Sequence, residues 1–172
     1  MYQRKSSVTG RFAAFSSSAF QLLALIGITL ALGSSPAAAN SKYAGIVVDA
    51  KTGKTLYAHD ADELRYPASL TKMMTLYLVF EALERGSIKL NTRIKFSANA
   101  AKEPPTKLGV GAGRSITVEQ AILALVTKSA NDASTAVAEH LGGSEAKFAS
   151  MMTAKARSLG MSRTTFRNAH GL

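Results

Sequence analysis

Hydrophobic residues follow two different patterns along this chain. The β-branched run at 46–48 and the apolar positions within 55–58 flank a polar stretch that contains Gly53, which predicts a β-hairpin with strands over 43–49 and 55–58. Residues 69–85 then carry apolar side chains on every side of a helix. Such a segment predicts a helix buried all round, with Gly86 as its C-terminal stop.

The second half of the chain has a helical pattern. Residues 99–114 contain two adjacent prolines and three glycines and are interpreted as a loop. Three helices are expected over 118–126, 132–141 and 145–159, the first with a capping box at Thr117 and the last with Ser144 as N-cap. A short strand is expected to start at 164–166. This succession indicates a mixed α/β (α+β) fold, and a lone hairpin is marginal in water, which hints that the chain is part of a larger domain.

The first 39 residues have the organisation of a secretory signal peptide. Three basic residues, Arg4, Lys5 and Arg11, precede an apolar run over 20–32, and alanines at 37–39 provide a small-residue cleavage site. The alternative is an uncleaved membrane anchor. It is disfavoured because a spanning helix needs about 20 apolar residues, so the protein is expected to be exported.

Composition narrows the chemistry. A length of 172 residues with 47% hydrophobic residues fits one globular domain. The net charge is +10, but the basic residues are scattered and lack interleaved aromatics, so no nucleic-acid partner is expected. Cysteine is absent, which excludes disulfides, thiolate catalysis and cysteine-based metal sites. Hydroxyls, amines, amides and carboxylates remain.

Ser69 and Lys72 are the first candidate pair. Their spacing puts both side chains on one face of the expected helix, where an amine can accept the proton of a serine hydroxyl. Lysine acts as a base only when it is desolvated or lies near positive charge, and the N-terminus of a buried helix offers both conditions. The alternative is a solvated lysine beside an N-cap serine. The three histidines, His59, His140 and His170, lie in no catalytic motif and are interpreted as surface or packing residues.

Ser129 and Asn131 form the second candidate pair, 60 residues further on. They lie two residues apart between two expected helices, so both can project into a cleft. The hydroxyl can relay a proton to a leaving amine, and the amide can orient Lys72 or hold a substrate carbonyl. An N-cap for the following helix is the alternative, and the two roles are compatible.

The two candidate pairs and their flanking residues together resemble the motifs of a known family. The motifs Ser69-Leu70-Thr71-Lys72 and Ser129-Ala130-Asn131, with flanking matches up to 166–172, resemble the serine-type D-alanyl-D-alanine carboxypeptidases, low-molecular-mass penicillin-binding proteins of peptidase family S11. The resemblance implies a β-lactamase/DD-peptidase-like fold. In that fold the hairpin belongs to an antiparallel sheet beside a helical subdomain.

The resemblance also implies a mechanism. Ser69 would form an acyl-enzyme with a peptidoglycan stem peptide ending in D-Ala-D-Ala, Lys72 would take its proton, Ser129 would pass a proton to the departing D-alanine, and Asn131 would bind substrate. The backbone N–H of Ser69 would supply half of the oxyanion hole. β-Lactams would be covalent inhibitors.

The family has a third motif, a Lys-Thr-Gly or Lys-Ser-Gly triplet after the second motif. Lys51-Thr52-Gly53 precedes the nucleophile and is interpreted as a turn. We therefore expect residues 40–172 to be the N-terminal portion of a catalytic domain, truncated before the third motif and lacking the later strands. A chain of this kind is expected to be unstable or to aggregate through exposed sheet edges and apolar surface.

Two alternatives stay open at this stage. One is a catalytically incompetent fragment of such an enzyme. The other is a serine β-lactamase of the same fold. It is disfavoured because residues 146–172 contain no Asp or Glu that could serve as the deacylating base of the class A enzymes. In addition, those enzymes usually carry an aspartate at the position of Ala130, between Ser129 and Asn131.

The resemblance sets expectations for location and partners. The protein is expected in the periplasm or on the outer face of the cytoplasmic membrane, with peripheral association with the inner membrane in the complete protein, and with a role in the cell wall and cell shape. No cofactor is expected. No metal site is expected either, because the histidines have no ligand spacing.

Overall fold

A computed structural model describes residues 43–172, so the predicted signal peptide lies outside the described residues. The chain divides into two compact units, Met1–Ala61 and Asp62–Leu172. Each unit is described by itself. In the described part of the chain, no helix is both long and apolar enough to cross a membrane.

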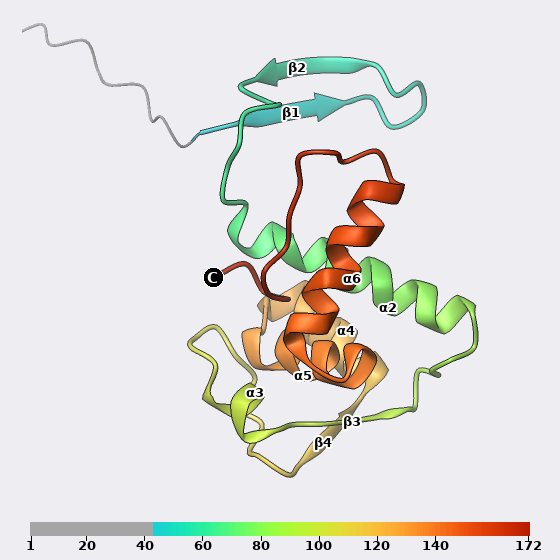
Figure 1. Cartoon of the computed structure of the whole chain (residues 1–172), viewed down its shortest axis with the longest axis vertical. Helices are drawn as coiled ribbons and strands as arrows, with labels where there is room; N and C mark the ends of the chain where they lie inside the picture. Colours follow the sequence, from blue (N-terminus) through green and yellow to red (C-terminus); the bar gives the residue numbers. More distant parts are fainter. Residues whose placement is uncertain (1–42) are drawn as a thin grey trace, which may run out of the picture. The chain divides into compact units, whose positions relative to one another are not determined.

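The described part of the first unit is the predicted hairpin (Figure 1). Strands β1 (Gly45–Val48) and β2 (Thr55–His59) pair antiparallel, with Ile46 opposite Ala58 and an irregularity after Val47. Asp49 organises the turn, because its carboxylate accepts hydrogen bonds from the Thr52 hydroxyl (2.6 Å) and the Thr52 N–H (2.7 Å). These bonds lower the pKa of Asp49. The interpretation of 51–53 as a turn is confirmed.

The second unit is mainly helical. Its elements in order are η1 (Ala68–Thr71), α2 (Lys72–Glu84), β3 (Arg93–Lys95), α3 (Ala98–Lys102), β4 (Ser115–Thr117), α4 (Val118–Leu123), the π-helical turn η2 (Ala124–Lys128), α5 (Asn131–Gly142) and α6 (Glu145–Ser158). β3 and β4 form a second antiparallel pair, with Ile94 opposite Ile116. The expected end signals are confirmed: the Thr117 capping box opens α4, Ser144 caps α6, and Gly86 and Gly160 follow α2 and α6 with positive φ.

Helix α5 is the centre of this unit. Residues 131–138 are all buried, and α5 contacts α2, α3, α4 and α6. One apolar cluster fills the space among α2, β3, α4 and α5, and contains Phe96, Val118 and Val137. A second cluster lies between α2, α5 and α6, and contains Phe148 and Met152.

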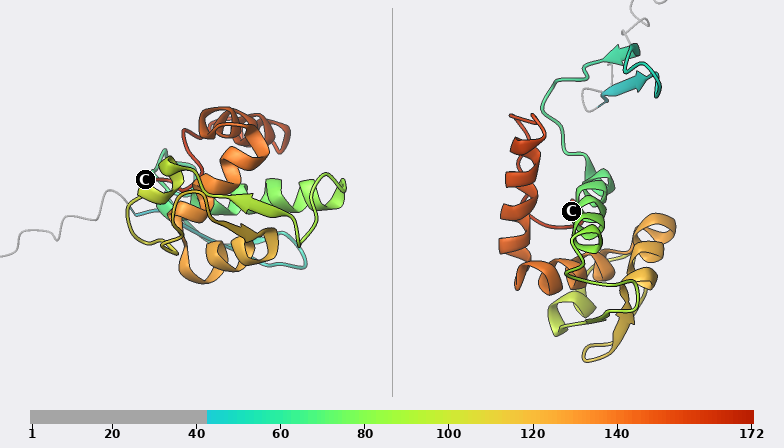
Figure 2. Two further views of the ribbon diagram at one scale, coloured as in Figure 1. Left: turned by 90° about the horizontal axis from the view of Figure 1, so that it is seen from below. Right: turned by 90° about the vertical axis from the view of Figure 1, so that its right-hand side faces the viewer.

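The final segment, 159–172, runs back between α6 and α2 (Figure 2). The Thr153 hydroxyl of α6 accepts a hydrogen bond from the Phe166 N–H (2.9 Å), and the Thr75 hydroxyl of α2 donates to the Ala169 carbonyl (2.8 Å). The segment thereby reaches the beginning of α2, where Ser69 and Lys72 lie.

The structure corrects three expectations. Helix α2 is not buried all round, because Met73, Tyr77 and Phe80 share an exposed face while Met74, Leu78 and Val79 pack inward. Helix α5 is instead the one buried on all sides, over residues 131–138, while His140 near its end is exposed. The segment 99–114 is not all loop, since Ser97 caps the short helix α3 by accepting from the Ala100 N–H.

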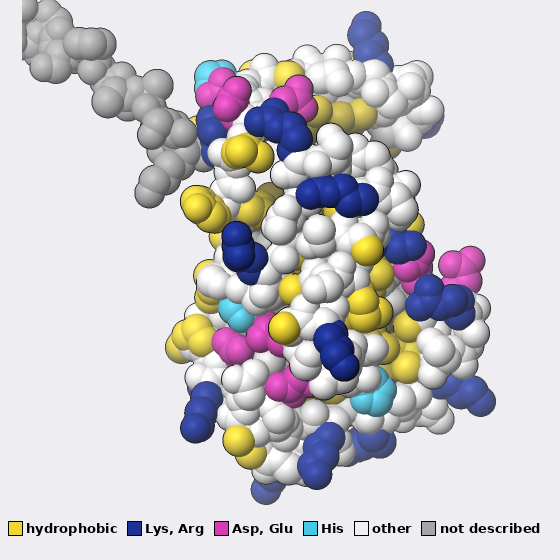
Figure 3. All heavy atoms as spheres, viewed as in Figure 1, with side chains coloured by type: hydrophobic (Ala, Val, Ile, Leu, Met, Phe, Trp, Pro, Cys, Tyr) yellow, Lys and Arg dark blue, Asp and Glu magenta, His cyan; other side chains and the backbone are white. Residues whose placement is uncertain are grey.

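The third correction concerns 164–166. In the described part of the chain no strand forms there, because the Phe166 N–H is taken by the Thr153 side chain rather than by a neighbouring strand. On the face drawn in Figure 3, Lys and Arg side chains are spread over the surface and do not gather in a stripe.

Candidate active site

Ser69 and Lys72 meet where the 3₁₀ turn η1 passes into α2. The Lys72 Nζ lies 3.3 Å from the Ser69 Oγ. Ser69 is exposed, whereas Lys72 is only 3% exposed. Burial lowers the pKa of Lys72, because removal from water disfavours the charged amine. An amine with a lowered pKa beside an accessible hydroxyl is the arrangement that activates a serine nucleophile.

The capping alternative for Ser69 is wrong. The N-cap of α2 is Thr71, and no side chain caps η1 or α2. Lys72 is not solvated either. The short 3₁₀ turn instead leaves the Ser69 side chain at the surface with the Lys72 amine beneath it.

A main-chain carbonyl orients Lys72. The Lys72 Nζ donates a hydrogen bond to the His170 carbonyl oxygen at 3.1 Å, across 98 residues of sequence. One turn further along α2, the Thr75 hydroxyl donates to the Ala169 carbonyl, which also accepts from Ser134 of α5. The segment that contains His170 therefore fixes one N–H direction of the amine, and the position of Ser69 fixes another.

Ser129 lies in the left-handed backbone region, with φ 55°, between η2 and α5. Its Oγ is buried and has no hydrogen-bond partner among the described residues. A buried hydroxyl without a partner is costly. It is therefore poised to bond with a group that enters the site, such as a substrate nitrogen.

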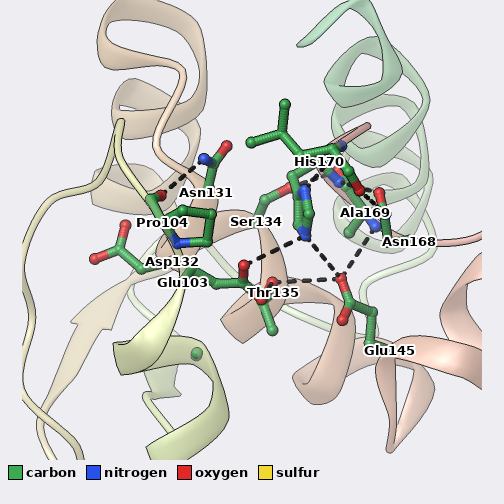
Figure 4. Close-up of polar contacts among 12 residues, drawn as sticks. Glu103, Pro104, Asn131, Asp132, Ser134, Thr135, Glu145, Asn168, Ala169 and His170 are labelled. Atoms are coloured by element: carbon green, nitrogen blue, oxygen red, sulfur yellow. Dashed lines mark hydrogen bonds and ion pairs between the residues drawn. The ribbon is translucent and has the colours of Figure 1, made fainter. Parts of the chain in front are cut away.

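Asn131 begins α5 and is 2% exposed. Its Nδ2 donates to the Pro104 carbonyl at 2.9 Å (Figure 4), and its backbone N–H donates to the Thr106 carbonyl at 2.8 Å. No side chain caps α5, so the capping alternative for this motif is wrong. Among residues 43–172, no hydrogen bond joins Ser129 or Asn131 to Ser69 or Lys72, and His170 rather than Asn131 contacts the Lys72 amine.

Asp132 fixes the loop that covers Asn131. This fully buried carboxylate accepts from the backbone N–H groups of Leu108 (2.8 Å), Gly109 (2.9 Å) and Val110 (3.4 Å), and of Ala133 at the start of its own helix (2.9 Å). The Thr106 hydroxyl in the same loop donates to the Ser129 carbonyl. The second motif is thus held by residues 104–110.

Sequence reasoning missed three polar residues close to this site. Glu103, Glu145 and His170 come from distant positions, and one ligand atom from each lies within 4.8 Å of the others. Their separation along the chain gave no spacing signal. Only the match of 166–172 to the family pointed toward this segment.

Comparison with known proteins agrees with these motifs. A family model described as D-alanyl-D-alanine carboxypeptidase, peptidase S11, matches residues 32–172. The D-alanyl-D-alanine carboxypeptidase DacF of Bacillus subtilis is 37% identical over 134 residues, which are 78% of this chain and 34% of that protein. The chain thus spans about a third of the length of the curated relatives it matches.

Solved structures give the same result. The D-alanyl-D-alanine carboxypeptidase DacD of Francisella tularensis superposes with a TM-score of 0.74 at 36% identity, covering 77% of this chain and 32% of that one. Penicillin-binding protein D2 of Listeria monocytogenes, in its ampicillin-bound form, has a TM-score of 0.61 at 32% identity, covering 75% of this chain and 51% of that one. The expected mixed α/β fold of this class is confirmed.

Proposed function

The chain belongs to the D-alanyl-D-alanine carboxypeptidase family S11, and from this we propose that the protein is a serine-type carboxypeptidase that removes the terminal D-alanine from peptidoglycan stem peptides. One observation carries the proposal: the buried Lys72 amine lies 3.3 Å from the exposed Ser69 hydroxyl. A base and a nucleophile in this arrangement can form an acyl-enzyme.

In the first step, Ser69 Oγ attacks the carbonyl carbon of the bond between the two D-alanines, and its proton passes to Lys72 Nζ. The lowered pKa of Lys72 supports this role, because a larger fraction of the amine is neutral near neutral pH. In the structure the amine donates one N–H to the His170 carbonyl and one to Ser69 Oγ. Once the amine is neutral, rotation about the Cε–Nζ bond directs its lone pair at the serine proton while an N–H stays on the His170 carbonyl. The backbone N–H of Ser69 serves as one oxyanion donor.

In the second step, the C–N bond breaks and Ser129 passes its proton to the departing D-alanine nitrogen, while the proton that Lys72 took from Ser69 replaces it on Ser129. The unpaired, buried Oγ of Ser129 supports this role, because a substrate nitrogen would supply the partner that it lacks. Asn131 binds the substrate, held in place by Pro104 and Thr106. Water then hydrolyses the ester at Ser69 and releases the shortened peptide.

The same serine would react with β-lactams, as the ampicillin-bound Listeria relative suggests. An exported enzyme of this kind acts in the periplasm or at the outer face of the cytoplasmic membrane, where it trims the cell wall and influences cell shape. Peripheral association with the inner membrane is part of the proposal. It draws on the predicted signal peptide and the family, not on the described residues.

The test is covalent labelling of the full chain by a fluorescent penicillin. We expect a labelled band in the wild type and none in Ser69→Ala. Ser144→Ala is the matched control, since it removes a serine that caps a helix, costs about 1 kcal/mol of stability, and keeps the label. Release of D-alanine from a peptide ending in D-Ala-D-Ala should follow the same order.

Two results would contradict the proposal. One is a label that persists in Ser69→Ala, which would place the nucleophile elsewhere. The other is a wild-type chain with a folded circular-dichroism spectrum that takes no label. The second result would favour a catalytically incompetent fragment.

A further inference from the structure

The side chains of Glu103, Glu145 and His170, from three separate segments, lie close together (Figure 4). His170 Nε2 lies 3.5 Å from Glu103 Oε2 and 3.7 Å from Glu145 Oε1. All three side chains are largely buried, at 8%, 12% and 20% exposure for His170, Glu103 and Glu145. The proposed reaction does not use any of these side chains.

The hydrogen bond at the other ring nitrogen defines the state of His170. The backbone N–H of Leu172 donates to His170 Nδ1 at 3.1 Å. A nitrogen that accepts a hydrogen bond carries no proton, so the proton of the neutral ring lies on Nε2 and faces the two carboxylates. A divalent cation at Nε2 would normally require an N–H at Nδ1, which this contact opposes.

The two carboxylates are themselves held. The hydroxyl of the fully buried Thr135 lies 3.0 Å from Glu103 Oε1 and 3.3 Å from Glu145 Oε1, and its single proton can be given to one of them at a time. Glu145 Oε1 also accepts from the Ala169 N–H at 3.2 Å. Each carboxylate therefore has a partner besides His170.

The cluster fixes the main chain on both sides of the site. The ring of His170 lies between the two carboxylates, and the carbonyl of the same residue accepts a hydrogen bond from Lys72 Nζ. At Glu103, the next residue is Pro104, whose carbonyl accepts from Asn131. The imidazole thus ties the segment that orients Lys72 to the segment that holds Asn131.

We propose that Glu103, Glu145 and His170 form a positioning triad for acylation: the neutral imidazole, bound between two carboxylates, holds the His170 carbonyl against Lys72 so that the amine stays aimed at Ser69. The proposal rests on the proposed function of Ser69 and Lys72. It assigns no contact with substrate to the triad.

The kinetic test uses the full chain and a fluorescent penicillin, with the acylation rate constant separated from the dissociation constant of the initial complex. We expect Glu103→Ala and His170→Phe to lower the rate constant about tenfold or more without changing the dissociation constant, because the amine is misdirected. Glu103→Gln should recover most of the rate, because its amide oxygen still accepts from Nε2–H.

Glu81→Ala is the matched control. Glu81 is likewise largely buried, with 22% exposure, and forms an ion pair with Lys155 at 2.6 Å, but this pair joins α2 to α6. It should lower stability and leave acylation unchanged.

A spectroscopic measurement separates this proposal from the proposed function. Nitrogen-15 NMR of the imidazole should show His170 protonated at Nε2 and unprotonated at Nδ1, whether or not the chain reacts with penicillin. A folded wild type that takes no label but shows this tautomer would contradict the function and leave the arrangement of the triad confirmed.

Four outcomes would overturn the triad. The first three are wild-type acylation in both Glu103→Ala and His170→Phe, a His170 protonated at Nδ1, and saturable one-to-one Zn²⁺ binding that shifts the His170 Nε2 signal. A Glu103→Gln rate as low as that of Glu103→Ala, with a matching loss of unfolding free energy, would reduce the cluster to a structural role and also overturn it.

Discussion

The segments around Ser69 and Ser129 are built alike but are held differently. Each contains a residue with left-handed backbone shortly before a helix, Ala68 with φ 49° and Ser129 with φ 55°. Ser69 is exposed and hydrogen-bonded to Lys72, whereas the Ser129 hydroxyl is buried and has no hydrogen-bond partner among residues 43–172. Strained backbone of this kind persists only where surrounding structure fixes it.

The residues that hold the Ser69 segment follow it in the sequence, whereas the residues that hold the Ser129 segment precede it. Carbonyls of Ala169 and His170 hold α2 through Thr75 and Lys72. The preceding loop, 104–110, holds the start of α5 through Asn131 and Asp132. Each short motif therefore supplies polar side chains, while a segment elsewhere in the sequence fixes their orientation.

The largest expected effect tests which segment carries the base. Lys72→Ala should lower the acylation rate by about 10³-fold, because general-base transfer contributes on that order. Lys155→Ala, which removes a lysine of α6 that pairs with Glu81, serves as the control and should acylate normally. A greater loss in Ser129→Ala than in Lys72→Ala would reverse the roles given to the two segments.

The second prediction concerns the support of Ser129 and Asn131. Asp132→Ala should lower the free energy of unfolding by about 3 kcal/mol, because it leaves the N–H groups of residues 108–110 without their buried acceptor. Denaturant unfolding measures this loss. The exposed first-turn acid of α4 is the control, and Glu119→Ala should change the same free energy by less than about 0.5 kcal/mol. Equal effects of the two variants would show that Asp132 acts only as a helix-terminal charge.

The third prediction concerns the support of Lys72. Gly171 has φ 85°, and an added Cβ would overlap the Ala68 carbonyl oxygen and lie 2.5 Å from the Thr71 hydroxyl. Gly171→Ala should therefore cost about 2 to 3 kcal/mol in unfolding free energy and slow acylation, since the segment at 166–172 must move away from η1. Both quantities can be measured on one preparation.

Gly160→Ala separates backbone strain from crowding. Gly160 has a similar φ of 82°, but its added Cβ would meet nothing within 4 Å. The Gly160→Ala variant should lower the free energy of unfolding by about 1 kcal/mol and leave acylation unchanged. If both glycine variants behaved alike, the close approach of Gly171 to Ala68 would have no part in holding the site.

Local patterns predicted the parts of the fold that local forces determine. The Thr117 capping box, the Ser144 cap and the glycines after α2 and α6 each act within a few residues, and all were found. β3 and β4 were missed because each has three residues and a single buried or half-buried apolar position, too few to show an alternation. The exposed face of α2 was missed because hydrophobicity alone does not show which side a neighbour covers.

For the candidate site, too, the sequence predicted the local contacts but not the long-range ones. The proximity of Ser69 and Lys72 follows from a spacing of three residues. The contact of Lys72 with His170 spans 98 residues, and that of Asn131 with Pro104 spans 27, so no local sequence spacing indicates either of them. The polar residues that surround the site could therefore be identified only from the folded structure.

The smallest expected effect is a pH dependence of stability at Lys72. Burial lowers the pKa of this amine in the folded chain below the 10.5 of an ordinary lysine. Below the folded pKa both states bind the proton, and the full cost of the buried charge is present. Between the folded pKa and about 10.5 the unfolded chain binds more protons, so the free energy of unfolding rises with pH, by at most about 1.4 kcal/mol per pH unit, and levels off above that range.

The difference in unfolding free energy between wild type and Lys72→Met should follow this rise. The variant Lys147→Met, which removes an exposed lysine of α6, corrects for the loss of a lysine in general. A difference that stays flat across the alkaline range would mean that folding does not penalise the charged amine, and the Ser69 segment would then lack the desolvated base that distinguishes it from the Ser129 segment.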